Sequence, residues 1–188
     1  LENNINVYRG DLDSIPKRLL GAAKKFNLDQ IVRITGDSVC LDYKSMSDLI
    51  ESHMDISPDC SMLKNAIFGT NKEIITFQTL EFLTERIASN NSSEYLEYFL
   101  KKPCLLKVNE IDVKYKCSEN TLNQRLTLDY EEDLIAINEL YNTCKDGYLS
   151  DIEEIVKQLE YPPFKMKNID MIQKTPINLN LDLDVNYD

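Results

Sequence analysis

Paired cysteines are missing from this sequence, and their absence excludes two kinds of site. The chain of 188 residues has five cysteines, which lie far apart and form no C-x-x-C pair. They also have no histidine neighbour, so neither a zinc site nor a disulfide framework is predicted. Free thiols in a reducing cytosol are the default for such a chain, and we therefore expect a cytoplasmic protein. The lone histidine, His53, is expected on the surface or half-buried on an amphipathic helix, without a catalytic role.

Long apolar runs and a basic surface are absent as well. No run approaches the roughly 20 apolar residues of a membrane span, and no secretory signal is recognisable. Acidic residues outnumber basic ones by 32 to 21, which gives a formal net charge of −11. Because phosphate groups would be repelled, neither nucleic acid nor an anionic membrane is an expected partner.

The length predicts one domain with an appendage. An apolar fraction of 43% is enough for a sizeable core. We place an α/β domain at residues 1–163 and a poorly ordered extension at 164–188, because the end of the chain alternates Leu with Asp or Asn and termini are often disordered.

Strands and helices are predicted to alternate along the domain. Strands are expected at 5–9, 31–35, 59–63, 73–77, 105–111 and 125–128, and helices at 14–26, 45–53, 77–88, 92–101, 130–141 and 150–160. This alternation predicts a three-layer α/β fold with a mostly parallel sheet and helices on both of its faces.

The stretch that ends at Asp37 carries the strongest functional signal. An apolar, β-branched run from Ile31 to Thr35 stops at Gly36-Asp37, and a helical pattern begins near Ser45. A buried parallel strand delivers a carboxylate to the carboxyl edge of a sheet in this way, and ligands bind at that edge. An Asp there can hold a divalent cation against a phosphate chain. The alternative is that Gly36 turns the chain and Asp37 caps the loop.

A second carboxylate, Asp129, follows the predicted strand at 125–128. It fits a helix N-cap, and Glu132 three residues later completes a capping-box pattern, so a purely structural role is open. Taken together with Asp37, it can complete a pair of strand-end carboxylates that binds one Mg²⁺. Asp133 is expected to face solvent or a neighbouring residue that supports the site.

The order of these segments resembles that of one enzyme family. The segments are Tyr8-Arg9-Gly10, Ala22-Ala23, Ile31 to Asp37, Leu41-Asp42, Ser93-Glu94-Tyr95 and Arg125 to Asp133. Their succession, from about residue 6 to about residue 159, is similar to that of cytidylyltransferases of the spore-coat-polysaccharide and CMP-sugar-acid synthetase type. The resemblance implies a Rossmann-like fold of the nucleotide-diphospho-sugar transferase kind. It also implies transfer of CMP from CTP to a sugar or sugar-acid hydroxyl, with release of pyrophosphate.

The resemblance further implies roles for single residues. Asp37 and Asp129 are the implied catalytic residues and Mg²⁺ ligands. Arg9, Arg18 and Gly36 are implied on the nucleotide side, and Asn65, Gly69, Thr70, Glu73 and Glu94 on the side of the sugar acceptor. Relatives often have Arg-Glu-His where this chain has Ser93-Glu94-Tyr95. Related enzymes are often dimers, so a homodimer is left open.

One segment of the family has no counterpart in this sequence: a Gly- and Arg-containing loop that ends in a Lys and cradles the CTP phosphates. The chain also starts at Leu1, without a Met and with a predicted strand. We interpret it as a fragment that lacks an N-terminal βα unit. Because the loop would supply N–H groups and cations to the triphosphate, the fragment alone is predicted to be inactive or nearly so.

Two rival functions remain. A metal-dependent glycosyltransferase of similar fold would favour Asp-x-Asp after a buried strand, but the two such patterns, at 11–13 and 182–184, do not follow one. A non-catalytic binding protein could keep the fold without the phosphate loop, although the retention of Asp37 and Asp129 argues against it.

Overall fold

The computed structural model describes residues 5–86, 96–101, 105–144, 149, 151–160, 166 and 168. The elements in chain order are α1 (Ile15–Phe26), β1 (Gln30–Arg33), α2 (Tyr43–Ile56), β2 (Cys60–Lys64), β3 (Glu73–Thr76), α3 (Phe77–Arg86), α4 (Leu96–Leu100), β4 (Val108–Asp112), α5 (Glu119–Leu122), α6 (Glu131–Thr143) and α7 (Ile152–Glu160). Most predicted elements are therefore present near their predicted places. Helix α1 begins next to its predicted start at residue 14, where Ser14 caps the helix and Pro16 lies in its first turn.

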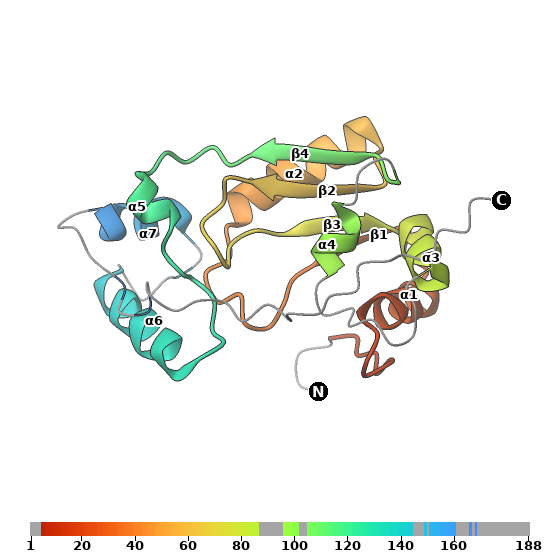
Figure 1. Ribbon diagram of the computed structural model, residues 1–188, viewed down its shortest axis with the longest axis horizontal. Coiled ribbons are helices and arrows are strands. Elements are labelled where there is room, and N and C mark those ends of the chain that lie inside the picture. Colours follow the sequence, from red (N-terminus) through yellow and green to blue (C-terminus); the bar gives the residue numbers. More distant parts are fainter. Residues whose placement is uncertain are drawn as a thin grey trace.

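The sheet has the strand order β1-β3-β2-β4 (Figure 1). β2 pairs with β4 in parallel, whereas β3 is antiparallel to both of its neighbours. Three of the four strands therefore run in one direction and β3 runs against them. The reversal follows from chain length, because residues 65–72 between β2 and β3 are too few for the crossover that a parallel neighbour needs.

Helices cover both faces of this sheet, as predicted. Cys60 and Met62 of β2 face one side with Ile75 of β3, while Leu63 and Ile74 face the other, as the alternation of a strand requires. The first face packs against α1, α3 and α4 through Leu19, Leu80, Leu83, Leu96 and Leu100, and the second packs against α2 through Leu49. The three-layer α/β class is confirmed.

A further group of helices lies beyond the end of the sheet toward which β4 points (Figure 1). Its apolar core includes Leu126, Ala136, Ile137, Leu140, Ile152, Ile155, Val156 and Leu159, mostly from α6 and α7. Cys40 and Ile67, from the segments that follow β1 and β2, are buried in the same core. This packing holds the segment before α6 against the carboxyl ends of the strands.

Two predicted strands are absent. Residues 5–9 form no strand, and the carbonyl of Val7 instead accepts a hydrogen bond from Lys25 of α1 at 3.1 Å. Residues 125–128 make only an isolated parallel bridge, between Arg125 and Phe68. A local apolar pattern cannot show whether a partner strand lies alongside, and in both places none does among the described residues.

The histidine is also placed differently from the prediction. His53 is 1% exposed, and its ring nitrogens lie 2.7 Å from Ser61 Oγ and 2.8 Å from Gln30 Oε1. It is therefore a buried, hydrogen-bonded residue between α2 and the sheet, not a surface one. Burial lowers its pKa below the ordinary value of histidine.

The boundary at residue 163 stays a prediction, because most of 164–188 lies outside the described residues. Met166 and Asn168 are described, and both are buried. The backbone N–H of Met166 donates to Gln124 Oε1 at 3.3 Å, so these two residues pack on the segment before α6.

Candidate functional site

Asp37 lies in a tight loop directly after β1, which is a partly exposed edge strand antiparallel to β3 and not the buried parallel strand that was predicted. The N–H of Ser38 donates to the Thr35 carbonyl, and the hydroxyls of these two residues lie 2.9 Å apart. A Cβ on Gly36 would meet no atom within 4 Å, so Gly36 leaves open space beside the loop. Oδ1 of Asp37 is buried and has no hydrogen-bond partner among the described residues. A buried acceptor of this kind is poised to accept a ligand atom or a cation.

Three segments that are distant in the sequence converge at this loop. The N–H of Leu128 donates to the Asp37 carbonyl at 3.1 Å, and that of Leu126 donates to the Phe68 carbonyl at 2.8 Å. Gly69 has a positive φ of 96°, and a Cβ there would lie 2.5 Å from the Leu126 backbone. A glycine is required for so close an approach. The chain thus brings the residues next to Asp129 against the loop that carries Asp37.

Asp129 is held by Arg125, which was not a predicted site residue. Arg125 Nη2 lies 2.5 Å from Asp129 Oδ2, and Thr127 Oγ1 donates to the same oxygen at 3.3 Å. The Arg125 side chain is 5% exposed, and its guanidinium also lies 5.2 Å from the rings of Phe68 and Tyr130. Both contacts use Oδ2, and the described residues form no hydrogen bond with the other carboxylate oxygen, Oδ1.

Asp133 is the second carboxylate that pairs with Arg125. Its carboxylate accepts from Arg125 Nε at 2.8 Å, from the N–H groups of Asp129 and Tyr130 at 2.9 and 3.0 Å, and from Asn168 Nδ2 at 2.7 Å. Burial by itself raises the pKa of Asp133, but these hydrogen bonds outweigh burial and lower it below the ordinary value.

Of the two alternatives for Asp133, the structure shows the second: it does not face solvent, but is the buried partner of Arg125, the residue that holds Asp129. The expectation about the helix cap is corrected. The N-cap position of α6 is Tyr130, and the side chain that returns to the N-cap backbone is that of Asp133, not Glu132. The predicted capping box, Asp129 with Glu132, is therefore one residue too early, and the observed pair is Tyr130 with Asp133. Both Asp and Glu can fill the third helical position of a capping box.

Lys72 is a second buried cation that sequence reasoning missed. It is 3% exposed, and its Nζ donates to Ser38 Oγ at 2.9 Å, to the Asn71 carbonyl at 2.8 Å and to the Gly69 carbonyl at 3.2 Å. Burial lowers its pKa, while the charges of Glu73 and Asp37 act in the opposite direction. Lys72 thus ties the turn after β2 to the Asp37 loop. The available signal was a Lys-Glu pair at the head of an apolar strand.

Glu73, a predicted acceptor residue, is engaged with another strand. It faces Arg33 across the β1–β3 pair, and the two side chains form a part-buried ion pair. Burial raises the pKa of Glu73, and the charge and hydrogen bond of Arg33 oppose that change.

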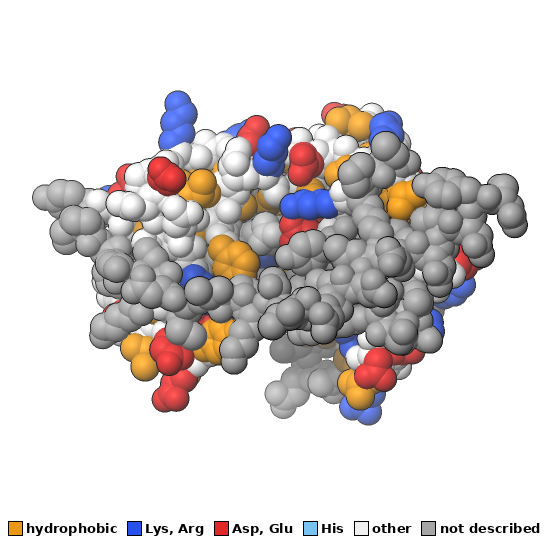
Figure 2. Space-filling view, viewed as in Figure 1, with side chains coloured by type: hydrophobic (Ala, Val, Ile, Leu, Met, Phe, Trp, Pro, Cys, Tyr) orange, Lys and Arg blue, Asp and Glu red, His pale blue; other side chains and the backbone are white. Residues whose placement is uncertain are grey.

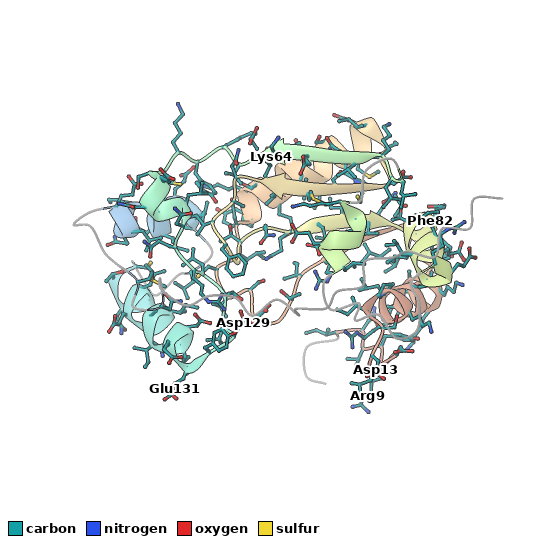
Figure 3. All side chains as sticks on the ribbon, in the orientation of Figure 1. Arg9, Asp13, Lys64, Phe82, Asp129 and Glu131 are labelled. Carbon is teal, nitrogen blue, oxygen red and sulfur yellow. The ribbon has the colours of Figure 1, made fainter. Side chains whose placement is uncertain are left out.

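The remaining predicted residues are dispersed. Thr70 Oγ1 donates to the Ile67 carbonyl in the turn beside Lys72, and Asn65 Nδ2 donates to Asp112 Oδ1 at the ends of β2 and β4. Figure 3 shows Arg9 near α1, well apart from Asp129, which lies closer to the middle of the molecule. Arg18 belongs to α1, and its guanidinium donates to the carbonyls of Asp11 and Leu12. Glu94 lies outside the described residues.

The carboxylates suit magnesium better than a metal that needs a full protein cage. No group of three or more metal-binding side chains occurs among the described residues. Mg²⁺ keeps several waters and uses one or two carboxylates together with substrate phosphates. Asp37 and Asp129 fit that requirement, because Oδ1 of each accepts no hydrogen bond from the described residues.

Comparison with solved structures gives a clear fold relative. The structure matches a cytidylyltransferase from Leptospira borgpetersenii serovar Hardjo-bovis with a TM-score of 0.75, over 94% of this chain and 73% of that one, at 22% identity. The chain has the fold of a cytidylyltransferase. The α/β fold that the resemblance implied is thereby confirmed.

The chain is also similar in sequence to two curated proteins. It is 23% identical over 165 residues to the spore coat polysaccharide biosynthesis protein SpsF of Bacillus subtilis, covering 87% of this chain and 68% of that protein. It is 29% identical over 166 residues to an uncharacterised protein of Methanocaldococcus jannaschii, covering 88% and 67% respectively. No family model matches.

Two further features of the described residues are the distribution of charge on the surface and the length of the helices. Acidic and basic side chains of the described residues are interspersed on the face shown in Figure 2. Among the helices of the described part of the chain, none is both long and apolar enough to cross a bilayer.

Proposed function

We propose that this chain belongs to a nucleotidyltransferase that transfers CMP from CTP to a sugar or sugar-acid hydroxyl and releases pyrophosphate. The observation that carries the proposal is the convergence of Asp37 with the segment of Asp129, in a chain of cytidylyltransferase fold. The relation to a spore coat polysaccharide biosynthesis protein supports a role in making surface polysaccharide.

The chemistry assigned to the chain is positioning and electrostatics. The acceptor hydroxyl would attack the α-phosphorus in line, which requires no covalent nucleophile from the protein. Bound Mg²⁺ supplies charge neutralisation at the phosphate oxygens. Asp37 and Asp129 are its proposed ligands. Arg125 fixes the Asp129 carboxylate, and Lys72 fixes the loop of Asp37 through Ser38.

The substrate assignments are part of the same proposal. Gly69 and Thr70 lie in the turn that Lys72 ties to the Asp37 loop, which supports an acceptor side near this turn. Glu73 would act there through Arg33 and not as a free carboxylate. The nucleotide-side role of Arg9 and Arg18 stays a prediction, as does the acceptor-side role of Asn65 and Glu94. The homodimer and the cytoplasmic location also stay predictions.

Turnover is proposed to require a phosphate-binding loop in addition to these residues. The 188 residues contain no Gly- and Arg-rich segment that ends in a Lys. Activity should therefore be measured with the 188-residue chain and with any longer form that its gene encodes. We expect the 188-residue chain to show little or no turnover.

The test is pyrophosphate release from CTP, ATP, GTP and UTP in the presence of Mg²⁺ and a panel of sugars and sugar acids. The expected result is release with CTP that EDTA stops and that Asp37→Asn reduces at least a hundredfold. Glu51→Gln, an exposed acid on α2, is the matched control and should retain full activity. Full activity of Asp37→Asn would overturn the metal assignment. Binding of CTP with no pyrophosphate release for any acceptor would favour a non-catalytic binding protein, and hydrolysis of a nucleotide-sugar would favour a glycosyltransferase.

A further inference from the structure

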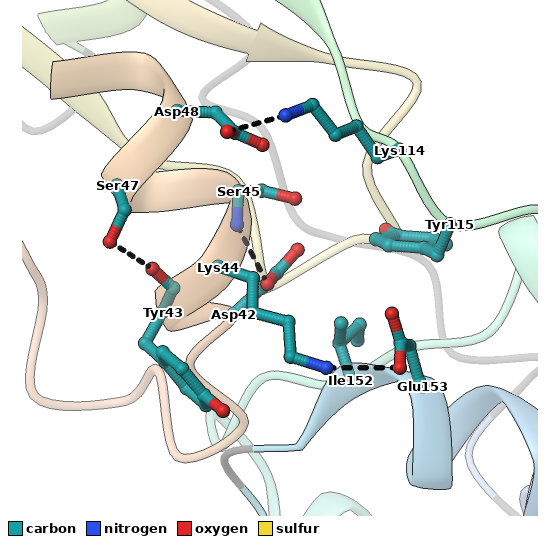
Figure 4. Close-up of a pocket in the computed structure, with 10 residues that line it drawn as sticks. All are labelled: Asp42, Tyr43, Lys44, Ser45, Ser47, Asp48, Lys114, Tyr115, Ile152 and Glu153. Atoms are coloured by element: carbon teal, nitrogen blue, oxygen red, sulfur yellow. Dashed lines mark hydrogen bonds and ion pairs between the residues drawn. The ribbon is translucent and has the colours of Figure 1, made fainter. Parts of the chain in front are cut away.

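A pocket of about 380 Å³ opens beside the start of α2 (Figure 4). Its walls come from the first turn of α2, from Lys114 and Tyr115 after β4, and from Ile152 and Glu153 at the start of α7. None of its lining residues was predicted as a site residue. We propose that this pocket is a second binding site, for a small ligand that carries a primary ammonium group.

Asp42 lines the pocket, and one of its carboxylate oxygens has no hydrogen-bond donor among the described residues. The residue is 1% exposed, and its Oδ1 caps α2 by accepting the Ser45 N–H at 3.0 Å. Its Oδ2 is buried and has no hydrogen-bond partner among the described residues. Figure 4 shows this oxygen turned toward the space between Ser45 and Tyr115. A buried carboxylate oxygen without a donor is unfavourable, so a ligand that donates a hydrogen bond here gains free energy.

The charges around the pocket select a cation. Lys44 of α2 pairs with Glu153 of α7 at 2.9 Å, and Lys114 pairs with Asp48 at 2.5 Å. Both lysines are thus neutralised by partners on other elements, and the carboxylate left over is that of Asp42. An anion would meet this carboxylate at the helix N-terminus, where the Ser45 N–H is already used. A ligand with a positive charge would complement it.

The shape and the aromatic side chains fit a compact polar cation. The volume is at the lower end of the range of small-molecule sites, and so suits a ligand of monosaccharide size. Tyr43 and Tyr115 line the pocket, and an ammonium group is attracted to the face of an aromatic ring. Two sources share this chemistry, an amino sugar and a short aliphatic diamine. The inference rests on Asp42 and the pocket, and does not depend on the proposed nucleotidyltransferase activity.

The test is isothermal titration of the full-length protein with D-glucosamine, 1,4-diaminobutane and D-glucose. The expected result is saturable binding of at least one amine and binding of D-glucose at least tenfold weaker. The relative affinities of the two amines distinguish a sugar from a diamine as the source. Asp42→Asn retains a side-chain oxygen for the N-cap but removes the charge, and should weaken amine binding at least tenfold. Glu51→Gln is again the control and should bind as the unmodified protein does.

Each other outcome overturns the inference. If Asp42→Asn, with an unchanged thermal unfolding midpoint, binds the amine as tightly as the unmodified protein, then Asp42 is not the anchor. If D-glucose binds as tightly as D-glucosamine, the ammonium group is not recognised. If no amine saturates the protein, the pocket is not a site for this class. Pyrophosphate release can be normal in all three cases, so failure here is distinguishable from failure of the proposed function.

Discussion

Replacing Asp133 with alanine should remove the support on which half of the candidate site rests. The carboxylate accepts hydrogen bonds from Arg125, from Asn168 and from the backbone N–H groups of Asp129 and Tyr130. Asp133→Ala removes one of the two carboxylates that pair with the buried guanidinium of Arg125, and the one that stays, Asp129, is partly exposed. Breaking a buried ion pair by removing one partner costs about 3–5 kcal/mol. We expect the free energy of unfolding to fall by that amount.

The measurement is urea unfolding followed by circular dichroism, with the slope m compared between variants. Asp133→Asn keeps the shape of the side chain and one acceptor oxygen, so its free energy of unfolding should fall by less than that of Asp133→Ala. Glu132→Ala, on the same helical turn, is the control and should change stability by no more than about 0.5 kcal/mol, as surface substitutions do. A loss below about 1 kcal/mol for Asp133→Ala, at unchanged m, would refute the reasoning.

The same pair has a signature in pH. The folded-state pKa of Asp133 is lowered, so its contribution to stability is complete above the unfolded-state pKa of about 3.9 and is lost as the pH falls through the folded-state value. The stability difference between the unmodified protein and Asp133→Asn should therefore be constant near neutral pH and shrink in strong acid.

Two further predictions concern buried bases. Burial lowers the folded-state pKa of His53, so stability should be constant above the unfolded-state pKa of about 6.5 and fall as the pH drops below it. Urea midpoints at pH 7.5 and 5.5 should differ less in His53→Phe than in the unmodified protein, and an equal difference would contradict this. Lys72→Met leaves the carbonyls of Gly69 and Asn71 without their donor, and should destabilise by about 1–3 kcal/mol in the same assay. A stability equal to that of the unmodified protein would show that Lys72 does not tie the two loops together.

Local periodicity was enough to predict much of the fold. Ile152, Ile155, Val156 and Leu159 lie at helical spacing, and all four are buried in α7 as that spacing implies. The direction of β3 depends on the length of the connection before it, which periodicity does not report. The predicted strand at 5–9 failed because alternation shows that a segment can be a strand but not that a partner is present.

The candidate site was predicted less completely, for a physical reason. Asp37 was proposed because a carboxylate at the end of an apolar run is a local pattern, although the run forms the partly exposed strand β1 and not a buried one. Lys72, Arg125 and Asp42 were missed because each is buried by segments distant in sequence, and charged residues are almost never fully buried without partners. A Lys next to a Glu, or an Arg before an Asp, is equally typical of an exposed segment, so its burial cannot be predicted until the segments that pack on it are known.

The unequal surroundings of the two site carboxylates give the proposal an internal check. Asp129 is ion-paired to Arg125, so part of its charge is already met, whereas Oδ1 of Asp37 has no partner among the described residues. A cation should therefore draw more of its binding free energy from Asp37. In the pyrophosphate assay, Asp37→Asn should raise the Mg²⁺ concentration for half-maximal rate more than Asp129→Asn does. Asp129→Asn should in addition lower the free energy of unfolding, because Arg125 loses a charged partner. The reverse order of metal dependence would mean that the cation is held mainly from the α6 side of the site.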